Sequence, residues 1–459
     1  MQISRMNSYR FEVLVMWSRA VPQFAPTEEC SVWSTDDERL LAVVIIDLTD
    51  RDYNFVILAR DKRGRFRCVD VGETYFTRRL AEKALIQRMP EVYARVNVTF
   101  EQGDETGNSL DFFTPQLPND RLHPNFRTLA EGPGYSAARG IITEMAHVFD
   151  EPDGNFITDF QSMGFNSRLW ELYLFGALVE EGFKLDRIHA QPDFIASTGN
   201  GRKVAIEATT VNPTVGNDGQ PVDPPTPKSF EELKKLRRDY MPIKFGGPLN
   251  GKLRKRDWER SHIDGLPYII AIADFHGPQT MTWSGPALSS YLFGLEVDLD
   301  RSTETGRPWQ YRPIEKHIWK EKQIPSCFFD QPDVENVSAV VFTNAGTLAK
   351  FNRMGVLADF GDPSVRLIRQ GTLLNPETES VAPIEFTIDV DDPKYSEGWA
   401  DELQVFHNPN AVCPLDRDLF PMATHHFLED GEVRSYSLPH TIFQSVTIIH
   451  SPKARNRPQ

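Results

Sequence analysis

The middle of the chain alternates helical segments with short apolar segments, and this alternation constrains the fold more than any other feature. Residues 168–182 repeat apolar side chains every three or four positions, with Asn166 or Ser167 as a cap and Gly182 as a left-handed terminator, which indicates a helix. The later segments predict strands at 192–197, 203–210, 267–275 and 337–343, and helices at 230–240 and 249–260. Helices that alternate with apolar strands predict an α/β layer architecture.

The first part of the chain predicts a smaller α+β module. Polar turns separate β-branched or aromatic segments at 11–16, 40–48, 54–59 and 66–71, which predicts a β-meander. Helical spacing over 77–88, with Thr77 as a cap, predicts a helix after it. We therefore expect three parts: a β-meander and helix module at 1–115, an α/β core at 126–350, and an acidic extension at 351–459 that packs on the core.

Charge is segregated along the chain. The whole sequence of 459 residues has a formal net charge of −15, which argues against a protein that coats nucleic acid over its entire surface. Residues 225–262 nevertheless carry 11 Lys and Arg against 5 Asp and Glu, whereas residues 330–459 carry 10 against 19. A basic segment within an acidic chain predicts a local groove for a polyanion.

Neither a membrane span nor a secretory leader is expected. The longest clean apolar run, at 40–46, is far shorter than the roughly 20 residues that a spanning helix needs. The first ten residues lack the apolar core of a signal peptide. The 4 cysteines are scattered and match neither a disulfide framework nor a metal motif. These features predict a cytoplasmic protein with reduced thiols.

Three acidic residues form the candidate site. Glu171 lies in the first helix of the core, Asp193 opens one strand, and Glu207 lies within the next, on the same face as Thr209. Apolar neighbours surround Glu207, so its carboxylate needs a cation or hydrogen bonds. Magnesium takes oxygen ligands, and Asp193, Glu207 and the peptide carbonyl of Ala208 are the expected ligands of Mg²⁺ or Mn²⁺. Such an ion activates water and offsets phosphate charge, which favours phosphodiester hydrolysis.

These residues resemble the PD-(D/E)XK nuclease superfamily. The matching segments are R-L-W-E-L-Y-L-F-G-A-L-V-E-E-G-F, then Q-P-D-F-I-A-S, then R-K-V-A-I-E-A-T-T, within residues 166–210. The resemblance implies a restriction-endonuclease-like mixed central sheet flanked by helices. It implies that Asp193 and Glu207 bind the metal and that Glu171 supports them. It also implies a metal-dependent nuclease that acts on DNA, in bacterial defence or DNA processing.

One position departs from the pattern of that superfamily. Thr209 stands where the family most often has a lysine that orients the attacking water and stabilises charge. A hydroxyl can hydrogen-bond the water but carries no charge. Members of the superfamily can place the lysine on a nearby element, and the candidates here are Lys203, Lys244 and Lys252. Lys252 is preferred, because Lys203 lies about 13 Å along the strand from Glu207.

The basic segment supplies the expected nucleic-acid contacts. Lysine and arginine contacts to phosphates provide most sequence-independent affinity, and the residues expected to make them are Arg237, Arg238, Lys244, Arg254, Lys255 and Arg256. DNA is the expected partner, and RNA stays open. The acidic C-terminal region is a candidate surface for a second copy or another protein. The rival interpretation is an inactive nuclease-fold protein that binds nucleic acid or serves assembly.

Overall fold

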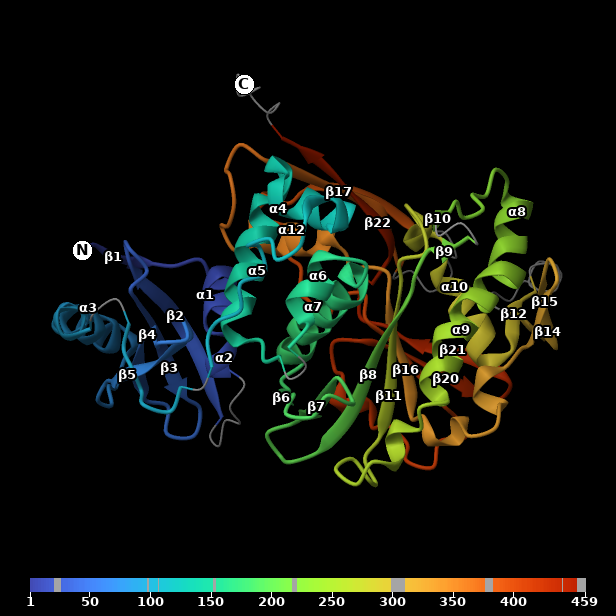
Figure 1. Cartoon of the computed structure of the whole chain (residues 1–459). Helices are drawn as coiled ribbons and strands as arrows, with labels where there is room; N and C mark the ends of the chain where they lie inside the picture. The colour runs from blue at the N-terminus through green and yellow to red at the C-terminus, as the bar shows by residue number, and fades with distance from the viewer. Residues whose placement is uncertain are drawn as a thin grey trace, which may run out of the picture.

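The computed structural model describes residues 1–19, 26–96, 99–105, 107–151, 154–216, 221–298, 310–375, 383–439 and 441–451. These residues form an antiparallel N-terminal sheet, a larger mixed sheet with helices on both faces, and a three-stranded sheet near the C-terminus (Figure 1). Two-stranded hairpins lie outside these sheets: β9 (Thr214–Val215) with β10 (Pro221–Val222), β12 (Leu295–Val297) with β13 (Tyr311–Pro313), and β14 (Lys316–Trp319) with β15 (Lys322–Pro325). In the ranges given above, no helix combines the length and the apolar character needed to cross a bilayer.

The N-terminal sheet has its strands in chain order. They are β1 (Ile3–Arg5), β2 (Thr27–Thr35), β3 (Leu40–Asp47), β4 (Tyr53–Arg60) and β5 (Phe66–Val71), each antiparallel to the next. Helix α3 (Arg78–Arg95) packs on one face, and α1 (Ser8–Leu14) packs on the other. Thr77 caps α3 as predicted, because its side chain accepts the N–H of Leu80 at 3.3 Å.

The strand expected at 11–16 is wrong. The side chain of Asn7 accepts the N–H groups of Tyr9 and Arg10 and thereby starts α1, which is followed by α2 (Met16–Arg19). Phe11 and Leu14, three residues apart, then both face the sheet. A short apolar segment does not reveal whether it has the period of a helix or of a strand. The sheet also contains β1 and β2, which the sequence analysis missed.

The central sheet has eight strands in the order β21-β20-β19-β16-β11-β8-β7-β6. Their bounds are β6 (Lys184–Asp186), β7 (Phe194–Ser197), β8 (Lys203–Val211), β11 (Tyr268–Asp274), β16 (Ala339–Thr343), β19 (Gln404–His407), β20 (Thr424–Glu429) and β21 (Glu432–Tyr436). β8, β11 and β16 are parallel neighbours, whereas β7 runs antiparallel to β8 and β19 antiparallel to β16. The fold is therefore α/β with a mixed sheet, as expected.

Helices cover both faces of this sheet (Figure 1). One layer contains α4 (Pro124–Glu131), α5 (Ser136–Val148), α6 (Phe156–Gln161), α7 (Phe165–Glu180) and α12 (Leu348–Leu357). The other contains a π-helical turn (Leu236–Tyr240), α9 (Met241–Leu253) and α10 (Gly285–Phe293), with α8 (Phe230–Lys235) before the turn. Helix α7 begins before both of its predicted caps. The Ser167 hydroxyl instead hydrogen-bonds that of Thr210 at 2.8 Å.

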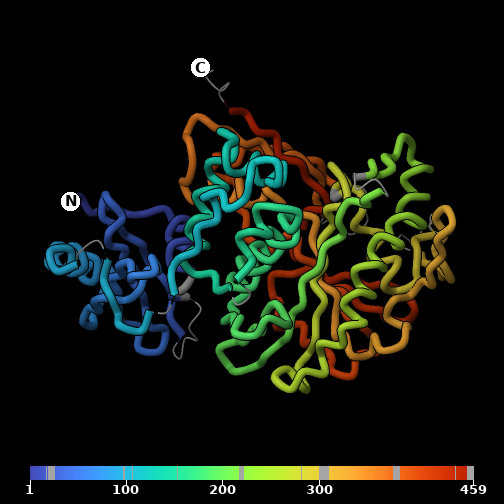
Figure 2. The backbone as a smooth tube through the Cα atoms, in the orientation of Figure 1, coloured from blue at the N-terminus to red at the C-terminus, as the bar shows by residue number. Residues whose placement is uncertain are grey.

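Residues after 350 return to the central sheet. They supply β19, β20 and β21, and they also form the separate sheet of β18 (Ile384–Asp389), β17 (Arg366–Leu373) and β22 (Ile442–His450). Figure 2 shows this C-terminal backbone, in orange and red, in both places. The boundary expected near residue 350 falls within α12, so the C-terminal segment is built into the core layer.

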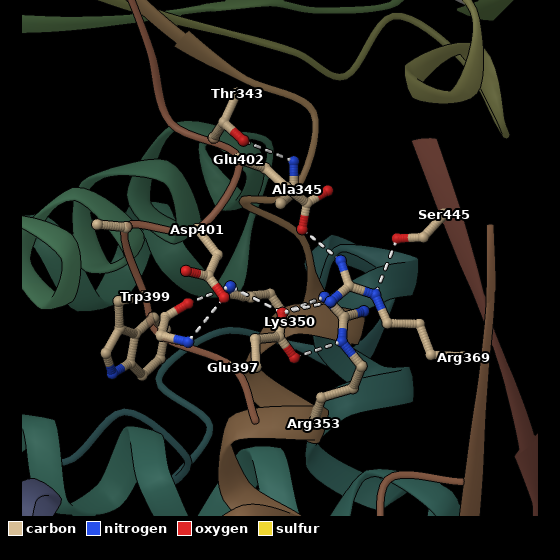
Figure 3. Close-up of polar contacts among 12 residues, drawn as sticks. Thr343, Ala345, Lys350, Arg353, Arg369, Glu397, Trp399, Asp401, Glu402 and Ser445 are labelled. Atoms are coloured by element: carbon tan, nitrogen blue, oxygen red, sulfur yellow. Dashed lines mark hydrogen bonds and ion pairs between the residues drawn. The ribbon is translucent and has the colours of Figure 1, made fainter. Parts of the chain in front are cut away.

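A buried ion-pair network joins α12, β17 and the segment that precedes β19 (Figure 3). Glu397 accepts hydrogen bonds from Lys350 Nζ at 2.7 Å and from Arg353 Nε at 2.8 Å. Arg369 lies 3.2 Å from Glu397 and also pairs with Glu402. Burial works against the charge of Glu397, but Arg353 and Lys350 hold its pKa well below the ordinary value. These contacts fix the C-terminal segment against α12.

Candidate active site

Glu207 is a buried acid in the middle of β8. This strand pairs with β7 on one side and β11 on the other. Its side chains alternate as predicted: Ala205 packs in the layer of α9, whereas Ile206 and Ala208 pack in the layer of α7. Glu207 lies two residues after Ala205 and is 2% exposed. An unpaired carboxylate at this depth would be costly, so its partners define the site.

The cation that meets Glu207 comes from the end of α9. Lys252 Nζ lies 2.5 Å from Glu207 Oε1, and the Lys252 side chain is 16% exposed. Lys255, in the turn after the helix, places its Nζ 3.7 Å from the same oxygen. A residue 45 positions away in the sequence thus supplies the ammonium that meets the Glu207 carboxylate.

The other lysines named from the sequence lie elsewhere. Lys203 is exposed at the start of β8. Lys244 is half-buried, and its Nζ donates to the Asn212 carbonyl and the Thr214 hydroxyl, each at 3.0 Å. These two bonds hold Lys244 beside residues 212 and 214, and its expected contact with phosphate stays a prediction. Thr209 is half-buried, two positions beyond Glu207 on β8.

Asp193 lies against Glu207 because β7 and β8 are paired. Asp193 Oδ2 accepts the backbone N–H of Ala208 at 2.7 Å. The backbone N–H of Asp193 donates to Glu207 Oε2 at 3.3 Å. These two bonds cross between the strands just beyond the Phe194–Ile206 pair of their ladder. The two acids predicted as metal ligands are therefore neighbours.

Glu171 approaches from α7 but is bound to arginines. Its carboxylate, in a residue 4% exposed, accepts from Arg168 Nη1 at 2.8 Å and from Arg187 Nη2 at 3.1 Å. Asp193 is the neighbouring acid that acts on it electrostatically. Glu171 thus lies beside Asp193, and its carboxylate is paired with two arginines.

Burial and the charge of Asp193 raise the pKa values of Glu207 and Glu171. Burial raises the pKa of Glu207 to about 7, and Asp193 adds to the rise while Lys252 opposes it. Burial, followed by Asp193, also raises the pKa of Glu171. Burial disfavours the charge of Lys252, yet Glu207 and Asp193 raise the pKa of its ammonium. Lys252 is therefore the cation that opposes the rise in the pKa of Glu207, and Asp193 is the second acid beside it.

Two residues of this neighbourhood escaped the sequence analysis. Asp257, in the 3-10 turn Asp257–Glu259, is fully buried; its Oδ1 accepts from Arg260 at 2.8 Å. Tyr268 begins β11 opposite Ala205 and is 1% exposed. Among the described residues, neither Asp257 Oδ2 nor the Tyr268 hydroxyl has a hydrogen-bond partner. Burial raises the pKa of Tyr268, followed by Glu207 and Asp257, so the three groups share one electrostatic environment.

Most of the basic residues named from the sequence are exposed, and Arg237 is half-buried. Arg254, Lys255 and Arg256 are exposed beside Lys252, and Arg256 pairs with Glu259 at 2.7 Å. Arg238 is exposed, 3.7 Å from Glu296. Arg237 is half-buried and donates from Nε to the Trp283 carbonyl at 2.8 Å. Arg237 is thus less exposed than the other arginines of this segment, and its expected contact with phosphate stays a prediction.

The fit to a metal ion rests on two carboxylates. In the part of the chain that the structure describes, no group of three or more His, Cys, Asp or Glu side chains is arranged to hold a metal. Asp193 and Glu207 are adjacent, however, and magnesium sites often use one or two carboxylates with several waters. No protein-family model, curated protein or solved structure matches this chain.

Proposed function

We propose that this protein is a metal-dependent nuclease with a restriction-endonuclease-like core, which hydrolyses phosphodiester bonds in DNA. The observation that carries the proposal is the contact of Lys252 Nζ with Glu207 Oε1 at 2.5 Å, beside Asp193. Acid, acid and lysine come from three separate elements into one place. This is the combination that the resemblance implies, with the lysine moved from position 209 to α9.

Each residue has a role in this proposal. Asp193, Glu207 and the Ala208 carbonyl would hold Mg²⁺ or Mn²⁺, which supplies a more acidic water and offsets phosphate charge. Lys252 stays protonated beside Glu207 and presents positive charge where the phosphate develops negative charge. Thr209 can hydrogen-bond the water. Glu171, fixed by Arg168 and Arg187, supports Asp193.

Nucleic acid would approach along the end of α9. Arg254, Lys255 and Arg256 are exposed there, directly after Lys252. Contacts of this kind bind the phosphate backbone without reading its sequence. A role in bacterial defence or DNA processing follows from the resemblance alone.

A second candidate function is an inactive binding or assembly module. The observation that favours it is that Lys252 and the Asp193 N–H already occupy the two oxygens of Glu207. A site closed by an internal ion pair needs no metal to be stable.

Cleavage assays separate the two functions. Supercoiled plasmid, single-stranded DNA and RNA are incubated with the full chain and Mg²⁺ or Mn²⁺, with chelator as the blank. We expect metal-dependent DNA cleavage that Asp193→Asn and Glu207→Gln abolish and that Asp264→Asn, at an exposed acid, leaves intact. Salt-sensitive DNA binding without cleavage by any metal would overturn the nuclease and support the binding module.

A further inference from the structure

A stacked pair of histidines joins the segment before Asp193 to the segment after α9. The ring centroids of His189 and His262 lie 3.9 Å apart, with 19° between the ring planes. His189 belongs to the segment between β6 and β7 and is exposed, whereas His262 follows the 3-10 turn Asp257–Glu259 and is half-buried. Within the described ranges, His189 stacks on no other ring. An exposed aromatic ring therefore rests on a second ring that supports one of its faces.

Hydrogen bonds to Gln191 hold the supporting ring in place. His262 Nε2 lies 2.9 Å from the Gln191 carbonyl oxygen, and because a carbonyl only accepts, Nε2 carries the proton. Arg260 Nη2 donates to the side-chain oxygen of Gln191, and Arg260 Nε donates to Asp257 Oδ1 at 2.8 Å. Asp257 is fully buried. The pair is thus anchored to the core, so a ligand that stacks on His189 meets a ring that is already ordered.

The same segments carry the candidate active site. Gln191, which accepts from His262, is two residues before Asp193. Asp257, which accepts from Arg260, is one of the acids whose charge raises the pKa of Glu207. A ligand on the exposed ring of His189 would therefore lie on the segment that leads into the two acids.

The chain on the His262 side of the pair is basic. Residues 252–262 carry five Lys and Arg against two Asp and Glu. Arg254 is exposed and makes no ion pair in the part of the chain that the structure describes, and the Lys255 side chain is 45% exposed. Arg256, in contrast, is paired with Glu259 and Asp333. Cations on the same segment as an aromatic pair are the combination that binds single-stranded nucleic acid, whose unpaired bases stack on rings while its phosphates meet the cations.

We propose that His189 is a stacking platform for an unpaired base, and that the protein binds a single strand of DNA there. The base lies on the face of the His189 ring that His262 does not cover, and Arg254 and Lys255 bind phosphates of the strand. Ile188, 81% exposed, adds an apolar contact beside the ring. In a duplex the base faces are covered by their neighbours, so the platform serves unpaired strands. This inference rests on the proposed function and names its substrate class.

Fluorescence anisotropy of labelled DNA with the full chain tests the platform. A thymidine oligomer is compared with a duplex of equal length, in chelator so that no metal-dependent cleavage occurs. We expect His189→Ala to weaken binding of the single strand by roughly fivefold or more and binding of the duplex by less than about twofold. His189→Phe keeps an aromatic ring and should bind the single strand within about threefold of the parent. His450→Ala, at an exposed histidine that ends β22, is the matched control and should change neither affinity.

Several results would overturn the platform. They are a parent chain that does not bind the thymidine oligomer at low salt, a His189→Ala chain that binds it like the parent, and equal weakening for single strand and duplex. Binding by His189→Phe that is as weak as that of His189→Ala would also overturn it, because the ring would then not be the cause. Metal-dependent cleavage together with any of these results rejects the platform alone, whereas ring-dependent binding without cleavage supports the platform and rejects the nuclease.

Discussion

Replacement of Lys252 by methionine removes the ammonium that meets Glu207 and keeps a side chain of similar length. Glu207 is 2% exposed, Lys252 is 16% exposed, and their charged atoms are 2.5 Å apart. Loss of one partner from a buried ion pair costs about 3–5 kcal/mol. Lys255, exposed and 3.7 Å from Glu207, retains roughly 0–1 kcal/mol of attraction. We therefore expect Lys252→Met to lose about 2–4 kcal/mol of unfolding free energy at about pH 8.

The size of this loss depends on pH through Glu207. Its folded-state pKa of about 7 lies above the ordinary 4.5, so between these values the folded chain binds more protons than the unfolded chain. The contribution of Glu207 to stability therefore falls as pH rises through this window. Without Lys252 the folded-state pKa rises by about one further unit for each 1.36 kcal/mol of attraction lost. The deficit of the variant is thus small at about pH 5.5 and grows above about pH 7.

Urea unfolding followed by tryptophan fluorescence, at about pH 5.5 and about pH 8.5, measures this deficit. Lys255→Met is the control and should stay within about 1 kcal/mol of the parent at both values. If Lys252→Met were as stable as the parent, or if its deficit were the same at both values, the ion-pair reasoning would be refuted.

Three further predictions concern other buried groups. Tyr268→Phe removes a hydroxyl that has no partner among the described residues, so urea unfolding should show a change of at most about 1 kcal/mol; a loss above about 2 kcal/mol would reveal a hidden acceptor. Glu397→Gln leaves Lys350 and Arg353 buried without their carboxylate and should lower the free energy of unfolding by about 3–5 kcal/mol, measured by calorimetry. The control Glu385→Gln, at an exposed acid, should change it little, and a loss under about 1 kcal/mol for Glu397→Gln would contradict the network. Burial lowers the pKa of His407 to about 3, so the folded state binds fewer protons than the unfolded state between that value and 6.5, and stability should fall as pH drops through this window. His407→Gln should lose part of that dependence in melting temperatures taken at about pH 7 and pH 5, and an unchanged dependence would show that His407 does not cause it.

Local sequence patterns predicted the parts of the fold that depend on local spacing. The alternation along β8 placed Glu207 opposite to Ile206 and Ala208, and the helical spacing after residue 168 located α7. The segment at 11–16 failed because six residues are too few to separate a strand from a helix. Asparagine is a preferred N-cap residue, so Asn7 was the sequence signal that could have identified α1. In the structure its side chain accepts the N–H groups of Tyr9 and Arg10.

The assembly of the site depends on contacts between distant segments, which spacing does not encode. Lys252 could be named as a candidate, but its distance from Glu207 depends on how α9 packs on the sheet. Tyr268 and Asp257 join the site through the register of β11 against β8 and the turn after α9. The sequence likewise gave no sign that Arg237 and Lys244 would bond to Trp283 and Asn212 within the fold.

Anomalous X-ray diffraction from crystals soaked in Mn²⁺ tests the central claim, that Asp193 and Glu207 form a divalent-cation site. We predict one strong peak about 2.1 Å from oxygens of both carboxylates, lost in Asp193→Asn crystals. Crystals saturated with Mn²⁺ that show no peak between these two acids, or that hold the ion only at other residues, would contradict it.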